Sequence, residues 1–241
     1  MNRRIKFVPG GIYHIYNRGV AKCNICEEDA DFWRMLQGLC LFNDKNNVNN
    51  ILWQIERDRG RLTLNVLKDY INKQDTIREP LVRILAYCIM PNHFHLVIAE
   101  FEEGGIVKLM HKFGTGYVRY FNKKHNRVGG LFQGRFKAVQ VESERQLLYL
   151  LIYINVINPG QLIEPNLKEE GIKNIGAVLE RAENYPWGTH QEYLGKRNSL
   201  IINKRRLIEM LDLDPPQKYR ELVENVLRAK KYATINHLLL E

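Results

Sequence analysis

Two histidines lie one residue apart in the segment MPNHFHLVI (90–98), inside a run that is otherwise apolar. Alternate residues of a strand share a face, so His93 and His95 project together, away from the face of Phe94. Neutral imidazole is a good ligand for Mn, Fe, Ni, Cu or Zn and is less typical for Mg. The pair therefore indicates a divalent metal site that needs at least one more ligand. A hairpin with a solvent-facing side that carries two histidines fits the same pattern.

Positive charge without any acid extends from residue 108 to residue 137, and aromatic residues are interleaved with it. Such a mixture suits single-stranded or hairpin nucleic acid, because cations meet phosphate while rings stack on bases. The segment GGLFQGRFK (129–137) is rich in glycine, which lets a backbone approach a ligand closely. A solvated helix face followed by a loop is the plainer alternative. The lack of acids favours nucleic acid, and the residues expected to bind it are Lys112, Arg119, Lys123, Lys124, Arg127, Arg135 and Lys137.

The composition sets wide limits on the class of protein. Apolar residues make up 45% of the 241 residues and charged residues 26%, which is typical of a globular protein with one well-buried domain and at most a small appendage. The formal net charge of +9 indicates a polyanionic partner. No apolar stretch approaches the ~20 residues that span a bilayer, and the N-terminal segment lacks an apolar signal core. We therefore expect a cytoplasmic protein with no membrane partner.

The residue pattern also predicts the scaffold that must hold these side chains. Pro91-Asn92 is turn chemistry between two apolar runs, which predicts a β-hairpin. Helical spacing and β-branched or aromatic runs predict the other elements. The expected order is β-α-β-β-α-β, an α+β fold with a ferredoxin-like antiparallel sheet. Its strands are expected at 10–20, 81–90, 93–100 and 136–141, and its helices at 27–45 and 105–126.

A further helix is expected after the last strand of the sheet. Ser143 and Gln146 have the spacing of a capping box, and residues 145–157 are apolar on most sides. A residue before proline disfavours the helical conformation, so we expect this helix to end before Pro159. The predicted organisation is a domain over 1–199, with an insertion at 46–80, and a helical C-terminal appendage over 200–241.

Two smaller features are open to more than one interpretation. Cys23 and Cys26 form a C-x-x-C, but no second pair stands at zinc spacing. A zinc site or a redox pair is one interpretation, and two reduced thiols are the plainer one. We take His14, in the first expected strand, as structural.

Several motifs together resemble the HUH single-tyrosine transposases, and in particular the REP-associated tyrosine transposases. They occur in the order of that family and cover roughly residues 8–195. The blocks MPNHFHLV (90–97) and GGLFQGRFKA (129–138) are highly specific in combination, and either alone would be weaker. The motifs are GGIYHIYNRG (10–19), MPNHFHLVI (90–98), YFNKKHNRVGGLFQGRFKAVQVES (120–143), YINVINP (153–159) and YPWGTHQEYLG (185–195).

The resemblance implies an HUH fold with an added catalytic helix and a divalent metal, Mg or Mn. It implies a tyrosine that cuts one DNA strand and stays joined to the 5′ phosphate. The implied substrates are single-stranded DNA with folded hairpins. The family's metal histidines correspond to His93 and His95, its tyrosine to Tyr153, and the asparagine that can complete the metal site to Asn158.

The spacing between the tyrosine and the asparagine departs from the family pattern, Y-x-x-x-N-P. Tyr153 and Asn158 are five residues apart instead of four, which turns the helix face by about 100° in a regular α-helix. A single π-bulge would absorb the extra residue and keep the two side chains together. Otherwise Asn155 could substitute, or the site could be damaged. Tyr149, one turn earlier on the same face, is the second candidate for the nucleophile.

The leading hypothesis from the sequence is a metal-dependent enzyme that nicks and rejoins single-stranded or hairpin DNA, a transposase. A DNA-hairpin-binding protein of the same fold without catalytic activity is the alternative. A hydrolytic metal nuclease that uses water is a third. A homodimer is compatible with the sequence.

Overall fold

The computed structural model describes residues 5–46, 64–72 and 78–229 of the chain. Its centre is a four-stranded sheet with the order β2-β3-β1-β4, in which all neighbouring strands are antiparallel. The fold is therefore α+β. The strands are β1 (Ile12–Arg18), β2 (Val82–Ile89), β3 (His93–Glu100) and β4 (Lys137–Gln140).

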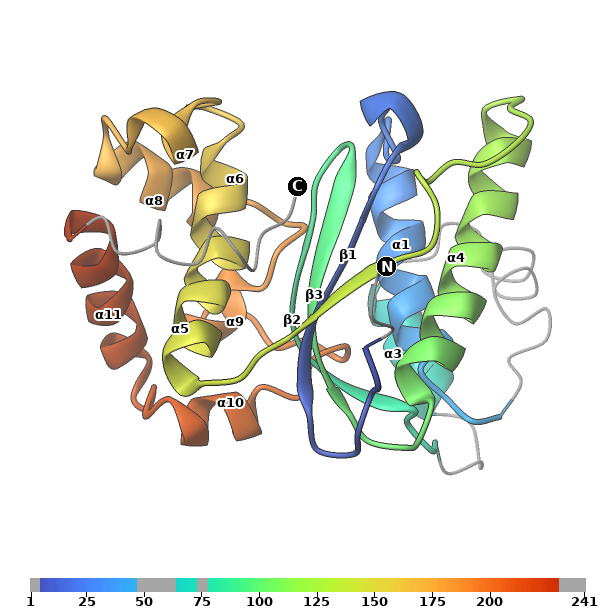
Figure 1. Cartoon of the computed structure of the whole chain (residues 1–241), viewed down its shortest axis with the longest axis horizontal. Coiled ribbons are helices and arrows are strands. Elements are labelled where there is room, and N and C mark those ends of the chain that lie inside the picture. Colours follow the sequence, from blue (N-terminus) through green and yellow to red (C-terminus); the bar gives the residue numbers. More distant parts are fainter. Residues whose placement is uncertain (1–4, 47–63, 73–77, 230–241) are drawn as a thin grey trace.

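Two long helices cover one face of the sheet (Figure 1). They are α1 (Asp29–Leu41) and α4 (Gly105–Lys124), with α3 (Leu64–Asn72) on the same side. The apolar face of β3 meets this layer, because the rings of Phe94 and Phe113 contact each other at 5.6 Å between centroids. A short 3-10 turn, η1 (Val20–Lys22), follows β1.

The opposite face of the sheet carries a second helical layer (Figure 1). Its first member is one continuous helical rod, made of α5 (Glu144–Ile152), the π-helix η2 (Tyr153–Ile157) and α6 (Asn158–Gly160). β2 and β3 are thus buried between two layers, which explains why they read as almost unbroken apolar runs. The remaining helices are α7 (Leu167–Glu170), α8 (Ile175–Glu183), α9 (His190–Tyr193), α10 (Arg205–Met210) and α11 (Pro216–Arg228).

The rod differs from the prediction at its end. We expected the helix to stop before Pro159, and this is wrong, because α6 continues to Gly160. The physical reason lies in the π turn that precedes the proline. In a regular α-helix the ring of Pro159 would meet the carbonyl of residue 155 and would leave it without a donor. A π turn shifts the hydrogen-bond register by one residue and relieves this conflict.

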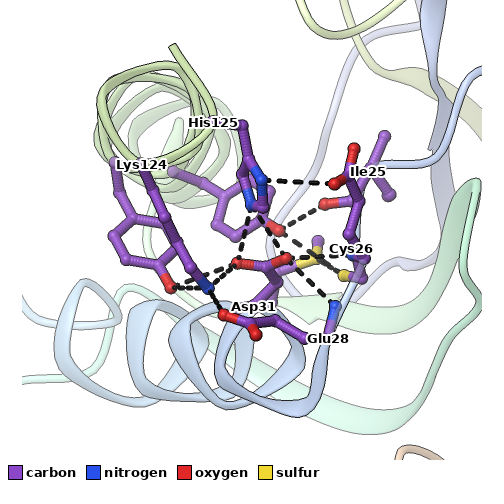
Figure 2. Close-up of polar contacts among 10 residues, drawn as sticks. Ile25, Cys26, Glu28, Asp31, Lys124 and His125 are labelled. Carbon is purple, nitrogen blue, oxygen red and sulfur yellow. Dashed lines mark hydrogen bonds and ion pairs between the residues drawn. The ribbon is translucent and has the colours of Figure 1, made fainter. Parts of the chain in front are cut away.

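A buried carboxylate joins the start of α1 to the end of α4 (Figure 2). Asp31 is fully buried and accepts hydrogen bonds from Lys124 Nζ at 2.7 Å and from the backbone N–H of Glu27 at 2.9 Å. His125 Nε2 lies 3.1 Å from the same carboxylate. Burial alone would raise the pKa of Asp31, but Lys124, the Glu27 N–H and His125 outweigh it and hold that pKa below its ordinary value. The cluster fixes α4 against α1.

The segment after residue 200 packs against the second layer. Tyr219, in α11, is fully buried, and its hydroxyl accepts a hydrogen bond from Asn155 Nδ2 at 3.1 Å. The backbone N–H of Asn203 donates to the carbonyl of Ile84 in β2 at 2.8 Å. The division into a domain and an appendage stays a prediction. Most of the expected insertion at 46–80 lies outside the described residues. None of the described helices is long and apolar enough to cross a membrane.

Candidate functional site

A row of polar side chains crosses the sheet on the face that meets the rod. Strand register places Lys137 of β4 beside Tyr16 of β1, and Tyr16 beside His95 of β3. The ammonium of Lys137 lies 5.9 Å from the centre of the Tyr16 ring, and the Tyr16 ring stacks on that of His95 at 5.9 Å. Arg18 follows two residues after Tyr16, opposite His93. The predicted common face of the histidine pair is therefore part of a larger polar surface.

The two histidines lie close together and each is held at one ring nitrogen. Their rings are 5.0 Å apart between centroids and nearly perpendicular. His95 Nδ1 is 2.8 Å from His14 Nε2, and His93 Nδ1 is 2.6 Å from the side-chain oxygen of Asn92. A ligand histidine commonly donates its second N–H to such a partner, which fixes the tautomer and the ring orientation. This arrangement assigns Nε2 of each ring as the atom that could coordinate a cation.

We expected His14 to be structural, and in the structure it contacts one of the two paired histidines, His95. It is fully buried in β1, and its ring stacks on that of His95 at 5.0 Å with an interplanar angle of 19°. The sequence signal for this contact was strand alternation, which puts His14, Tyr16 and Arg18 on one face of β1. The cross-strand partner, however, depends on the register between β1 and β3.

Tyr153 is the tyrosine of the rod that reaches the histidines. Its ring stands edge-on to the His95 ring, with 5.5 Å between centroids. The side chain is 1% exposed, and its phenol oxygen accepts a hydrogen bond from Lys168 Nζ at 2.5 Å. Tyr149, one turn earlier, is half-buried and lines a separate groove with Leu148, Met210 and Val226. The geometry therefore distinguishes the two candidate tyrosines.

The π turn occurs at the point where the spacing of five residues required it. The backbone N–H of Asn158 donates to the carbonyl of Tyr153, which is the hydrogen bond of a π-helix. One extra residue is thereby absorbed, and Asn158 follows Tyr153 by one helical turn. The side chain of Asn158 is fully buried, and its oxygen accepts a hydrogen bond from Gln161 Nε2 at 3.1 Å.

Asn155 was the alternative to Asn158, and the structure engages its amide elsewhere. Its oxygen accepts a hydrogen bond from Thr189 Oγ1 at 2.7 Å, and its nitrogen donates to Tyr219. Thr189 is in turn bonded to the backbone of Tyr87 in β2. Asn155 thus ties the rod to β2 and α11.

A pocket opens beside the histidine pair. Arg18 and Gln133 belong to it and were missed from the sequence, whereas Lys137 was predicted. Gln133 is positioned by the glycine-rich loop, because its N–H donates to the carbonyl of Arg18 at 2.9 Å. Gly134 has a φ of +156°, a conformation that favours glycine. The lining residues are Tyr16, Asn17, Arg18, His93, His95, Gln133 and Lys137.

The other expected DNA-binding residues do not line this pocket. Arg119 and Lys123 are exposed on α4, which covers the opposite face of the sheet (Figure 1). Lys112 Nζ donates to the carbonyl of Asp44 at 2.8 Å, and Lys124 is paired with Asp31 and Glu28 (Figure 2). Arg127 and Arg135 lie in the loop between α4 and β4. The continuous basic stretch of the sequence is therefore divided between two faces.

Of the two cysteines in the C-x-x-C, Cys23 is half-buried and Cys26 is buried. Cys26 is buried, and burial raises the pKa of its thiol to about 12. Within residues 5–46, 64–72 and 78–229, no group of three His, Cys, Asp or Glu side chains is arranged to hold a metal. The metal ligands expected from the sequence are two histidines and the amide of Asn158, and asparagine is not one of these four residue types.

The donor chemistry of that set fits a divalent cation. Two imidazole nitrogens, each on a ring that is held at its other nitrogen, and one amide oxygen are ligands that Mn accepts readily and Mg less typically. The oxygen of an asparagine has two lone pairs, so Asn158 could coordinate while it accepts the hydrogen bond from Gln161.

The fold and site define an α+β protein with a histidine pair and a buried tyrosine on one face of an antiparallel sheet. Residues 50–156 match the family model described as "Transposase IS200 like", so this segment of the chain is similar to the IS200-like transposases. The match includes the histidine pair and Tyr153 and ends two residues before Asn158.

The chain was also compared with curated proteins and with solved structures. No curated protein matches the chain in sequence. Among solved structures, the chain is similar to a REP-associated tyrosine transposase determined with a REP hairpin bound, with 10% sequence identity and a TM-score of 0.44. The alignment covers 84% of this chain and 91% of that protein.

Proposed function

We propose that this protein cleaves and rejoins single-stranded or hairpin DNA through a 5′-phosphotyrosine intermediate. The observation that carries the proposal is the edge-on contact of the Tyr153 and His95 rings, 5.5 Å apart between centroids. It brings a phenol to the histidine pair from a helix about sixty residues later in the sequence. In this proposal Tyr153 is the nucleophile, His93 and His95 hold Mg or Mn, Asn158 is the third ligand, and the sheet with its rod is an HUH domain.

The residues of the chain have separate tasks in this reaction. The scissile phosphate binds in the pocket beside His93, where Arg18 and Lys137 offset its charge. A phenol has a pKa near ~10 and attacks poorly by itself. A divalent cation, when bound, polarises the phosphate and stabilises the charge that develops on its oxygens. Because Tyr153 is 1% exposed in the DNA-free protein, neighbouring side chains have to move before a phosphate can reach it.

The bond changes explain both cutting and joining. The phenol oxygen of Tyr153 forms a bond to phosphorus, and the bond from phosphorus to the 3′ oxygen breaks. The phenolic proton is, overall, transferred to the 3′-hydroxyl that leaves. The phosphotyrosine ester keeps the energy of the broken bond, so a 3′-hydroxyl can reverse the step and join a new end. Strand transfer therefore needs no ATP.

The π turn removes the main argument for the alternative, a DNA-binding protein without chemistry. That alternative relied on the five-residue spacing, and the Asn158 N–H to Tyr153 carbonyl bond absorbs the extra residue. The remaining basic residues, Arg119, Lys123, Arg127 and Arg135, are proposed to contact DNA outside the pocket. Lys112 and Lys124 are the weakest members of the predicted set because both are engaged within the protein.

The first prediction concerns the nucleophile. Tyr153→Phe should abolish the covalent protein–DNA adduct and leave DNA binding nearly intact, because it removes only the attacking oxygen. Tyr149→Phe should still form the adduct. The assay uses a pool of hairpin oligonucleotides labelled at the 3′ end, with Mn²⁺, followed by denaturing electrophoresis and an electrophoretic mobility shift.

Three outcomes of this assay contradict the proposal. An undiminished adduct in Tyr153→Phe moves the role to another tyrosine. Free 5′-phosphate ends without any adduct identify a hydrolytic nuclease. Shifted complexes without cleavage by the wild-type protein identify a DNA-binding protein.

A further inference from the structure

A lysine outside the recognised motifs contacts the oxygen of Tyr153. Lys168 Nζ donates a hydrogen bond to the phenol oxygen at 2.5 Å, and the same ammonium lies 4.7 Å from the centre of the ring. Lys168 is half-buried and belongs to α7, which follows the rod. The contact therefore involves the very atom that the proposed function uses for attack.

The chain places Lys168 there through close packing at the end of the rod. Leu167, the preceding residue, is 1% exposed and anchors α7. A Cβ atom at Gly160 would lie 3.1 Å from the Leu167 side chain and 2.9 Å from that of Val178. Glycine at this position thus allows α7 and α8 to approach the rod directly. Glu164 holds the following loop by accepting the backbone N–H groups of Lys173 and Asn174 at 2.9 Å.

We propose that Lys168 is a second catalytic residue, which stabilises negative charge on the Tyr153 oxygen during cleavage and rejoining. The inference depends on the proposed function. As Tyr153 attacks phosphorus, its oxygen loses a proton and carries negative charge, and an ammonium at hydrogen-bond distance offsets that charge. In the reverse step the phenolate is the leaving group, and the same ammonium stabilises it as the bond to phosphorus breaks.

The contact with Lys168 explains how a buried phenol could ionise and act as a nucleophile. A phenol that is 1% exposed gains little help from water when it ionises. A lysine at 2.5 Å supplies a fixed donor in the place of water. An ammonium cannot accept the phenolic proton, so Lys168 assists through charge and hydrogen bonding and is not the base.

The test compares variants of Lys168 in single-turnover adduct formation with labelled hairpin DNA and Mn²⁺. Lys168→Met keeps much of the side-chain shape and removes the charge, and it should slow the adduct about 10²-fold, the effect of losing one donor to a developing oxyanion. Lys168→Arg keeps the charge and should recover most of that loss. Lys173→Met is the matched control, because Lys173 is exposed and paired with Glu170, and it should behave as the wild type.

Two further measurements separate action on the nucleophile from other roles. A substrate with sulfur at the 3′ bridging position has an improved leaving group, so the defect of Lys168→Met should persist if Lys168 acts on Tyr153. In a Tyr153→Phe background, Lys168→Met should leave the salt dependence of DNA affinity unchanged, whereas a lost phosphate contact would reduce the slope by about one.

Each contrary result overturns the inference in a recognisable way. Rescue by the sulfur substrate would place Lys168 at the leaving group, and a reduced salt slope would make it a DNA contact. If Lys168→Met forms the adduct as fast as the wild type, or faster, Lys168 only shields Tyr153 and does not assist its attack. Loss of activity in Lys168→Arg with an unchanged melting temperature would show that charge is not the property required. If the wild type forms no adduct, the proposed function fails first.

Discussion

At the scale of single residues, the site is a set of side chains held by other side chains. His95 is the clearest case, because one of its nitrogens contacts His14 and its ring faces both Tyr16 and Tyr153. If Nε2 of His95 coordinates a cation, Nδ1 carries the proton and donates it to His14. His14 then acts through His95 as a positioning residue.

This role of His14 can be tested by metal binding to the DNA-free protein. His14→Leu should weaken Mn²⁺ affinity by about 10 to 100-fold, the usual effect of losing such a partner. His14→Gln offers an acceptor near the position of Nε2 and should restore part of the affinity. Calorimetric titration with Mn²⁺ measures both.

Two controls accompany this titration. His111→Gln, on the exposed side of α4, should bind Mn²⁺ as the wild type does. Melting temperatures show whether the fully buried position tolerates leucine. Wild-type Mn²⁺ affinity in a folded His14→Leu protein would contradict the positioning role.

At the scale of elements, the π turn is the feature on which the site depends. It accommodates the step of five positions from Tyr153 to Asn158, and it allows the helix to continue through Pro159. The start of the rod agrees better with the sequence, which predicted a capping box there. Ser143 accepts the N–H of Gln146 at 3.2 Å, although the Gln146 side chain returns to the N–H of Glu142 and not to that of Ser143.

A one-residue deletion tests whether the π turn serves to keep Tyr153 and Asn158 together. Removing Ile157 shortens the spacing to four, and a regular α-helix that now ends before the proline would place the asparagine one turn after Tyr153. The protein should still form the adduct, at a stability cost of about 1.5 to 3 kcal/mol for the lost buried side chain. Helix content by circular dichroism and the adduct assay measure the outcome.

The matched control removes Leu151 from the regular part of α5. Both deleted residues are buried, so the loss of apolar area is similar. Without a π turn to absorb it, this deletion rotates the following residues by about 100° and should abolish the adduct. Equal loss of activity in the two deletions would contradict the proposed role of the π turn.

At the scale of the whole molecule, a buried polar network attaches the C-terminal helix α11 to the rod and to α9. His190 Nδ1 lies 2.9 Å from the Tyr219 hydroxyl, which also accepts from Asn155. Burial lowers the pKa of His190 to about 4, and Glu183 opposes the shift while Arg220 and Lys196 reinforce it. α11 is therefore attached through a histidine that stays neutral in the folded protein.

This network predicts how stability depends on pH. The unfolded chain binds a proton at His190 with a pKa near 6.5, and the folded chain does so only near 4. Stability is thus fully present above about pH 6.5 and falls by up to about 3 kcal/mol as the pH drops to 4. Urea unfolding of the wild type and of His190→Gln at several pH values measures the difference.

The expected result is a weaker dependence on pH in His190→Gln over this window. His111→Gln should keep the wild-type dependence, because His111 is exposed on α4. Parallel curves for the wild type and His190→Gln would show that His190 does not carry this contribution.

The sequence alone determined the elements and several members of the site, because those depend on local rules. Turn chemistry, apolar period and capping residues act within a few neighbours, and they predicted the order β-α-β-β-α-β, to which the structure adds the helix α3 before the second strand. Strand alternation predicted the shared face of His93 and His95, and residue counting offered a π turn as one way to keep Tyr153 and Asn158 together. The tail was harder to interpret, since the burial of Tyr219 follows from contacts with residues far away in the chain.

Only the tertiary structure decided which side chains meet. Strand register set His14 beside His95, the glycine loop brought Gln133 to the pocket, and the close packing at Gly160 brought Lys168 to Tyr153. The sheet also divided one basic stretch of sequence between two faces. Such contacts join residues of different elements, and their geometry depends on how entire layers pack, which no local pattern of residues encodes.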